Sequence, residues 1–221
     1  QQIQLFGVYP GNPVRKLLFF GDSFVQGNGL SGLDHTADFG TYSKETFPTL
    51  TANLLNLQYE NLGFGGTSIC DTTTRILETD IEKNEIVCVL WPESSRVGKM
   101  PNKEKKLSTF CSADDQNHVV DYYRKYWSEE KSLHDAKVNI AVANSYVTSK
   151  FGICINIPGV WTQQKEFVDQ YIYDWADISY ITESLCNFQI DVVADGHYGP
   201  ETHKSFAEYL SKFISSYISI L

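Results

Sequence analysis

The chain has 221 residues and a formal net charge of −9, with 18 Lys and Arg against 27 Asp and Glu. This length favours one domain with a full core, and the charge argues against a nucleic-acid partner, because phosphates are neutralised by clustered Lys and Arg. Five scattered cysteines form no C-x-x-C pair, so neither a zinc site nor a dense disulfide scaffold is indicated.

The first 13 residues contain Pro10, Gly11 and Pro13, and we expect them to form an extended lead-in. Because the sequence begins with Gln1 rather than Met, we expect that something precedes it, and a lost signal or a preceding domain stays open. No signal peptide is recognisable, and no apolar run approaches the length of a membrane span. We therefore expect a soluble protein; cytoplasm and virion are both candidate locations, and the oligomeric state stays open.

Residues 17–20 are apolar and predict a short strand buried on both faces. A glycine ends that run, and Asp22 and Ser23 follow where the strand should end. Gly27 and Gly29 then keep the backbone able to turn tightly. A serine at the carboxyl edge of a parallel strand lies where open α/β sheets bind ligands. The alternative is that Asp22 or Ser23 merely caps a following helix.

Strands and helices alternate along the rest of the chain. Residues 30–45 are polar and glycine-rich, and we expect a loop over the site; residues 99–106 are basic and indicate a solvated loop rather than a binding arm. Residues 152–161 are apolar, but their pattern assigns them neither to a strand nor to a helix. Further strands are predicted at 59–62, 86–90 and 138–143. Helices are predicted at 46–57, 115–135, 163–179 and 205–221, and one more contains Ile76 and Leu77. This alternation predicts a parallel sheet covered on both faces.

Residues 194–200, Ala-Asp-Gly-His-Tyr-Gly-Pro, lead into the last predicted helix. Together with Ser23, Asp195 and His197 supply the three groups that acyl transfer needs. The hydroxyl is a weak nucleophile, the imidazole takes its proton, and the carboxylate holds and stabilises the imidazolium. We therefore predict a Ser-His-Asp triad, which needs neither a metal nor an organic cofactor.

The Gly-Asp-Ser at 21–23 and the Asp-Gly-His at 195–197 resemble the SGNH (GDSL) hydrolase family of esterases and lipases. The chain is not similar to α/β-hydrolases, because Val25 occupies the last glycine of their G-x-S-x-G elbow. The resemblance covers most of the chain in four short blocks. It implies a three-layer, flavodoxin-like α/β fold with a central parallel sheet of about five strands, in a single domain over 1–221.

The second block, residues 61–68, is similar to the family's Asn…Gly turn after strand two. Gly66 matches the glycine whose backbone N–H joins that of Ser23 in the oxyanion hole. Such a role suits a residue without Cβ, because the carbonyl oxygen can then approach the amide. A plain strand-to-helix turn is the alternative interpretation of this glycine pair.

The third block departs from the family, whose Gly-x-Asn-Asp supplies an Asn side chain as a further oxyanion donor. Residues 91–96 are instead Trp-Pro-Glu-Ser-Ser-Arg. A Trp…Arg segment at this point looks like the SGNH-like proteins of bacteriophages and other large viruses. Arg96, Ser94 or Ser95 is a candidate for the missing donor; alternatively, Arg96 is a structural ion-pairing residue.

The fourth block is also altered, because the family has Asp-x-x-His and the spacing here is one residue shorter. The backbone of Gly196 can absorb the difference, and Asp191 is a second candidate for the carboxylate. His203 matches a second histidine that often opens the last helix. We favour His197 as the base, since the base must be oriented by a nearby carboxylate. The three remaining histidines, at 35, 118 and 134, are expected to be exposed.

These observations predict a serine ester hydrolase that acts on a small acyl ester, such as acetate on a sugar. The substrate expectation rests on the resemblance and on the lack of a recognisable apolar lid. An aromatic content of 14% suits a carbohydrate-facing or virion-surface protein. Two alternatives stay open: a catalytically degenerate SGNH fold that serves as a binding or virion-surface module, and acyl transfer to an acceptor other than water.

Overall fold

The computed structural model describes residues 14–33, 38, 40–94, 96–99, 108–110, 128–159, 181, 183, 185–194 and 196–218. The predicted lead-in and the predicted helix at 163–179 lie outside these residues. Asp195, Ser95 and nearly all of the basic cluster at 99–106 also lie outside them.

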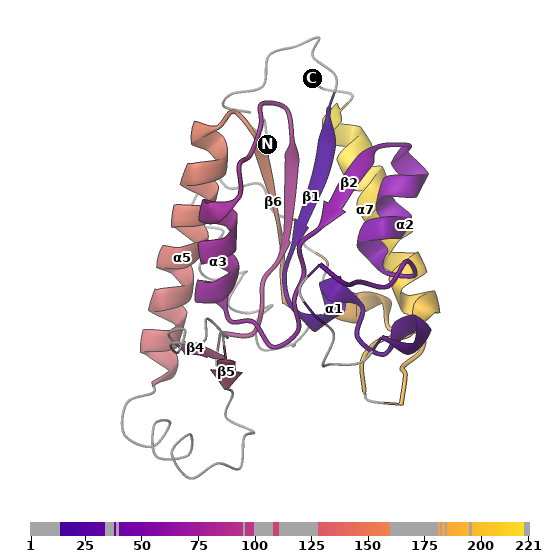
Figure 1. Cartoon of the computed structure of the whole chain (residues 1–221), viewed down its shortest axis with the longest axis horizontal. Coiled ribbons are helices and arrows are strands. Elements are labelled where there is room, and N and C mark those ends of the chain that lie inside the picture. Colours follow the sequence, from indigo (N-terminus) through magenta and orange to yellow (C-terminus); the bar gives the residue numbers. More distant parts are fainter. Residues whose placement is uncertain are drawn as a thin grey trace.

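Four parallel strands form the central sheet in the order β2-β1-β3-β6, and helices cover both of its faces (Figure 1). The strands are β1 (Lys16–Phe20), β2 (Gln58–Asn61), β3 (Ile86–Leu90) and β6 (Ile153–Ile157). The predicted parallel sheet with a helical layer on each side is thereby confirmed, and the described residues contain four strands where about five were expected.

The predicted helices at 46–57 and 205–221 and the one containing Ile76 and Leu77 are present with shifted ends, and the structure adds a short strand pair that was not predicted. A short antiparallel hairpin, β4 (Val97–Lys99) with β5 (Ser108–Phe110), flanks the basic cluster. The helices are α1 (Ser23–Gln26), α2 (Phe47–Leu55), α3 (Ile69–Glu78), α5 (Glu129–Ser149) and α7 (Pro200–Ile218), with short 3₁₀ turns η1 (Leu30–Gly32) and η2 (Leu185–Phe188).

The core lies in two layers because successive side chains of a strand point to opposite faces of the sheet. In β1, Leu17 and Phe19 pack against α2 and α7, whereas Leu18 and Phe20 pack against α3 and α5. Fully burying side chains of this size contributes about 1.5–3 kcal/mol each. The unbroken apolar runs of β1 and β3 are therefore explained by burial on both sides, and Cys88 is buried in β3 as expected.

The sheet reverses its winding between β1 and β3. From β1 the chain passes through α2 to β2 on one side, then returns through α3 to β3 on the other side. In open α/β sheets, ligands bind in the crevice outside the carboxyl ends of the strands at such a reversal. Ser23 directly follows β1, and Arg96 comes six residues after β3, so both belong to this edge.

The predicted strand at 138–143 is wrong, because these residues lie inside α5. Along this helix, Ala136, Ile140, Ala143 and Val147 are buried while Val138 and Val142 are exposed, which is a helical rather than an alternating period. A short apolar run does not by itself distinguish a strand from a helix. The fourth sheet strand is instead β6, within the stretch that the sequence left unclassified.

The start predicted for this helix, residue 115, lies outside the described residues, and the described helix begins at Glu129. Ser128 caps it by accepting a hydrogen bond from the backbone N–H of Lys131. None of the described helices is both long enough and apolar enough to cross a bilayer.

Candidate active site

Ser23 is the first residue of α1, directly after the turn that ends β1. Asp22 caps this helix, since its Oδ1 accepts a hydrogen bond from the N–H of Phe24 at 3.1 Å. The capping interpretation is therefore correct for Asp22. Gly21 has a φ of +152°, and a Cβ there would lie 2.6 Å from the carbonyl oxygen of Leu90. Only glycine allows the chain to turn this closely against β3.

The structure brings Ser23 and His197 together from opposite ends of the chain. Nε2 of His197 lies 2.8 Å from Oγ of Ser23, although 174 residues separate them. The ring of Phe24 contacts both His197 and Tyr198, with centroids 5.0 and 5.2 Å apart. This packing fixes the imidazole in hydrogen-bond reach of the hydroxyl.

The segment that carries His197 is tied to the start of α7 by Asp191. Oδ1 of Asp191 accepts hydrogen bonds from the N–H and the hydroxyl of Thr202 at 2.9 and 2.8 Å. Oδ2 accepts from the N–H of Glu201 at 3.2 Å. Desolvation alone would raise the pKa of Asp191, but these hydrogen bonds outweigh it and lower the pKa below its ordinary value. Asp191, the second candidate for the triad carboxylate, is thus engaged in capping α7.

Gly199 allows Asp191 to approach the helix this closely. A Cβ on Gly199 would lie 2.3 Å from Oδ2 of Asp191, closer than any van der Waals contact. Backbone hydrogen bonds from Val193 N–H to His197 carbonyl and from Gly199 N–H to Asp191 carbonyl close the segment on itself. His197 is therefore presented on a short braced turn.

Gly66 lies in the turn after β2, with a φ of +75° that favours glycine. Asn61 connects this turn to α1: its Nδ2 donates to the carbonyl of Val25 at 2.8 Å, and its Oδ1 accepts from the N–H of Gly63 at 3.0 Å. Within the described part of the chain, no hydrogen bond engages the backbone N–H of Ser23 or of Gly66. Both are unengaged donors on neighbouring turns.

Gln26 is a residue of this site that the sequence analysis missed. Its side chain is buried, Oε1 accepts from the N–H of Gly65 at 2.7 Å, and Nε2 donates to the carbonyl of Thr41 at 3.0 Å. It therefore holds the Gly66 turn and part of the 30–45 loop against α1. The only signal was a carboxamide directly after two apolar residues of a short helix, and such a pattern is common in helices far from any active site.

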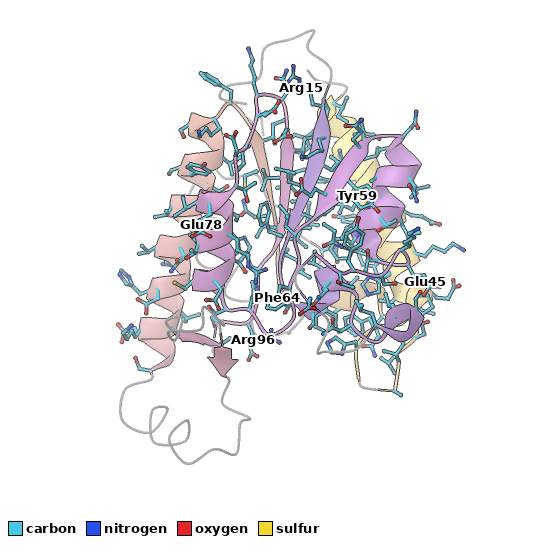
Figure 2. The ribbon with its side chains drawn as sticks, viewed as in Figure 1. Arg15, Glu45, Tyr59, Phe64, Glu78 and Arg96 are labelled. Carbon is cyan, nitrogen blue, oxygen red and sulfur yellow. The ribbon has the colours of Figure 1, made fainter. Side chains whose placement is uncertain are left out.

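Arg96 pairs with Asp22 at the carboxyl edge of the sheet. Its Nη1 lies 3.1 Å from Oδ2 of Asp22, and the two side chains are only 16% and 3% exposed. The same nitrogen donates to the carbonyl of Thr67 at 3.5 Å. Figure 2 shows Arg96 and Phe64 at one end of the sheet and Arg15 at the other. Ser94 accepts a hydrogen bond from Ser132 through its carbonyl oxygen.

Trp91, which opens the altered third block, is held by a buried polar network. Its indole Nε1 donates to Oδ1 of Asn156 at 2.9 Å, and Nδ2 of Asn156 donates to Oδ1 of Asn144 at 2.9 Å. Asn156 lies in β6, and Asn144 lies on α5. The network anchors the segment that leads from β3 towards Arg96.

His203 lies at the contact between α2 and α7. It is 1% exposed, its Nδ1 accepts the N–H of Phe47 at 3.1 Å, and its ring stacks on that of Phe47. Phe47 opens α2, so this bond satisfies one of the N–H groups that a helix start leaves unpaired. Burial lowers the pKa of His203 to about 4, so the ring is neutral at neutral pH. His134 is exposed as predicted, whereas His35 and His118 lie outside the described residues.

Among the described residues, no group of three or more His, Cys, Asp or Glu side chains is arranged to hold a metal ion. The chemistry that the described geometry offers is that of a hydroxyl beside an imidazole, with two unengaged amide donors nearby.

Solved structures of the lipolytic G-D-S-L (SGNH) family share this fold. A member of the lipolytic G-D-S-L family from Veillonella parvula superposes with a TM-score of 0.55 at 11% identity, over 91% of this chain and 98% of that one. A carbohydrate acetylesterase from Sinorhizobium meliloti gives a TM-score of 0.59 at 10% sequence identity, over 91% of this chain and 99% of that one.

An acetyl xylan esterase from Butyrivibrio proteoclasticus gives a TM-score of 0.54 at 15% identity, over 97% of this chain and 66% of that one. No family model and no curated protein matches the sequence. At these identities the likeness is one of fold, and it confirms the SGNH fold that the sequence motifs predicted.

Proposed function

We propose that this protein is a serine ester hydrolase of the SGNH type that acts on small acyl esters. The observation that carries the proposal is the 2.8 Å contact between Ser23 Oγ and His197 Nε2. A nucleophile and its base require this separation, about 2.6–3.2 Å. The contact lies at the carboxyl edge of the sheet, where this class of fold binds ligands.

In the proposed reaction, Ser23 attacks the ester carbonyl while His197 takes the hydroxyl proton. The N–H groups of Ser23 and Gly66 stabilise the negative charge on the tetrahedral oxygen, and Asp195 orients the imidazolium. His197 then gives its proton to the leaving alcohol, and an acyl-enzyme remains. Water hydrolyses that acyl-enzyme by the same sequence, with His197 first as base and then as acid. None of these steps uses a cofactor.

We propose that Arg96 supports the oxyanion site from the position where the family carries an Asn after strand three. Its position at the carboxyl edge of the sheet, beside Asp22 and Thr67, supports this assignment. A guanidinium stays charged at any working pH and has several donors, so it can hold a carboxylate and a carbonyl oxygen at the same time.

The proposed substrate is an acetyl or similarly small acyl group on a carbohydrate hydroxyl. Two of the structures that share this fold are described as a carbohydrate acetylesterase and an acetyl xylan esterase, which supports the class.

The test combines labelling with turnover. We expect a fluorophosphonate to modify Ser23, located by mass spectrometry of the digested protein. Wild-type protein should hydrolyse p-nitrophenyl acetate, and Ser23→Ala should lose at least about 10³-fold in kcat. Ser149→Ala, at an exposed serine of α5, is the matched control and should behave as wild type. An adduct on another serine, with Ser23→Ala fully active, would overturn the assignment.

A binding or virion-surface module is the second candidate, and the missing third-block Asn favours it. Residues 91–96 contain no carboxamide, so the family's third oxyanion donor is lacking. Such a loss typically costs about 10²–10³ in turnover. If wild-type protein hydrolyses no short acyl ester and Ser23 takes no fluorophosphonate, this second function replaces the first.

A further inference from the structure

We propose that Arg96 is a positioning residue: it sets the oxyanion site by joining the turn that carries Ser23 to the turn that carries Gly66. The inference rests on the proposed function, and it assigns how Arg96 acts there. Arg96 comes from the segment after β3, whereas the two turns follow β1 and β2. One side chain thereby connects three loops at the reversal of the sheet.

The first connection runs through Asp22. One oxygen of its carboxylate accepts the N–H of Phe24, and the other accepts from Arg96 at 3.1 Å. The peptide bond between Asp22 and Ser23 contains the N–H that is the first proposed oxyanion donor. Holding the Asp22 side chain from two sides therefore restricts the direction of that N–H.

The second connection runs through Thr67, the residue after Gly66. Its carbonyl accepts from Arg96 at 3.5 Å, and its hydroxyl donates to the carbonyls of Gly21 and Phe64 at 3.3 and 3.1 Å. The turn after β2 is thus attached to the turn after β1 by Thr67 itself and through Arg96. Loss of Arg96 removes the link between Asp22 and the carbonyl of Thr67, while the Thr67 hydroxyl still joins the two turns.

Burial and charge make this connection strong. A buried ion pair that loses one partner leaves an uncompensated charge, so the remaining side chain must move towards water. The Asp22 side chain is 3% exposed, and it cannot reach water without disturbing the start of α1. In the intact pair the two charges balance, so Arg96 acts by fixing geometry rather than by adding net positive charge.

The experiment measures kcat and KM on p-nitrophenyl acetate for Arg96→Ala, Arg96→Lys, Asp22→Asn and the Asp22→Asn/Arg96→Ala double variant. Asn is as good a helix cap as Asp, so Asp22→Asn keeps the cap but removes the charge and places an NH2 donor where Oδ2 accepts from Arg96. Small misplacements at a reacting centre cost up to about 10²-fold. We expect each of Arg96→Ala and Asp22→Asn to lower kcat roughly 10- to 100-fold, with KM changed by less than about threefold.

The double variant should lose no more than the worse single variant, because both changes break the same contact. Arg96→Lys retains a charged donor at a similar reach and should recover part of the loss. Arg15→Ala is the matched control: it removes an exposed Arg–Glu pair at the opposite end of the sheet and should leave kcat unchanged.

Three results overturn the inference. Normal kcat in Asp22→Asn with impaired Arg96→Ala means that Arg96 touches the substrate directly. Multiplicative losses in the double variant mean that the two residues act separately. Normal kcat in Arg96→Ala with a lower Tm means that the pair is structural only.

Failure of the proposed function is recognised separately, because wild-type protein is then inactive and Ser23 takes no fluorophosphonate. In that case, amide hydrogen exchange over residues 62–68 still measures whether Arg96 connects the Ser23 turn to the Gly66 turn. Exchange should rise to a similar extent in Arg96→Ala and Asp22→Asn, and unchanged exchange in either variant overturns the inference.

Discussion

Acidification should destabilise this protein through His203 before most of its carboxylates titrate. The ring is buried between α2 and α7, and Nδ1 must stay unprotonated to accept the N–H of Phe47. Burial lowers the pKa of His203 in the folded protein from 6.5 to about 4. The unfolded chain therefore binds a proton that the folded protein does not, between these two values.

The difference between these two pKa values sets the direction and the size of the change in stability with pH. Because the unfolded state binds more protons in this window, the free energy of unfolding falls as the pH falls. Each unit of pKa corresponds to about 1.4 kcal/mol. His203 therefore lowers the free energy of unfolding by about 2 kcal/mol at pH 5 and by about 3 kcal/mol below pH 4. At pH 7.5 the cost is absent. A loss of this size is a large share of the stability of an ordinary domain, about 5–15 kcal/mol.

The assay is urea unfolding at pH 7.5, 6.0 and 5.0, with wild-type protein compared with His203→Asn. The Asn oxygen can replace Nδ1 as the acceptor of the Phe47 N–H, but it does not titrate. We expect the free energy of unfolding to fall by about 2 kcal/mol more in wild type than in the variant between pH 7.5 and 5.0. Asp191, whose pKa is lowered from 3.8, contributes equally in both proteins and loses its effect only at lower pH. Parallel pH dependences in the two proteins would refute the reasoning.

Three further predictions concern the site and its supports. His197→Ala should lower kcat by about 10³-fold or more with little change in Tm, whereas His203→Asn should keep most of its kcat at pH 7.5; the reverse pattern would mean that the base was misassigned. Asn156→Leu leaves the indole N–H of Trp91 buried without its acceptor and should cost about 1–3 kcal/mol, measured as a lower urea midpoint. Gly199→Ala places a Cβ 2.3 Å from Oδ2 of Asp191, so both Tm and kcat should fall as the His197 turn shifts; a wild-type kcat would contradict this account of the turn.

The parts of the fold that were predictable are those encoded within a few neighbouring residues. The apolar runs of β1 and β3 are long enough to indicate strands buried on both faces, and a glycine–aspartate–serine turn follows the first of them. The run at 138–143 was ambiguous, because valine, isoleucine and alanine suit a buried helix face as well as a strand. Only packing against α3 and the sheet decides between them.

The supports of the candidate site were not predictable, because each depends on a partner far away in the chain. Arg96 and Asp22 are 74 residues apart, and Trp91 and Asn156 are 65 apart. From residue types alone, Arg96 was equally suited to donate to a substrate or to pair with any of the acidic side chains. Asn156 interrupts the apolar run of β6, yet only the fold shows that an indole N–H lies opposite it.

The distance along the chain between Ser23 and His197 has a consequence during synthesis. The segment that contains β1 and Ser23 leaves the ribosome before the turn ahead of α7, which supplies the imidazole that contacts its hydroxyl. In the proposed mechanism, the serine stays an unactivated alcohol until α7 has docked on α2. In this proposed mechanism, a nascent chain that has not yet reached residue 197 therefore carries the complete serine turn without an activated hydroxyl.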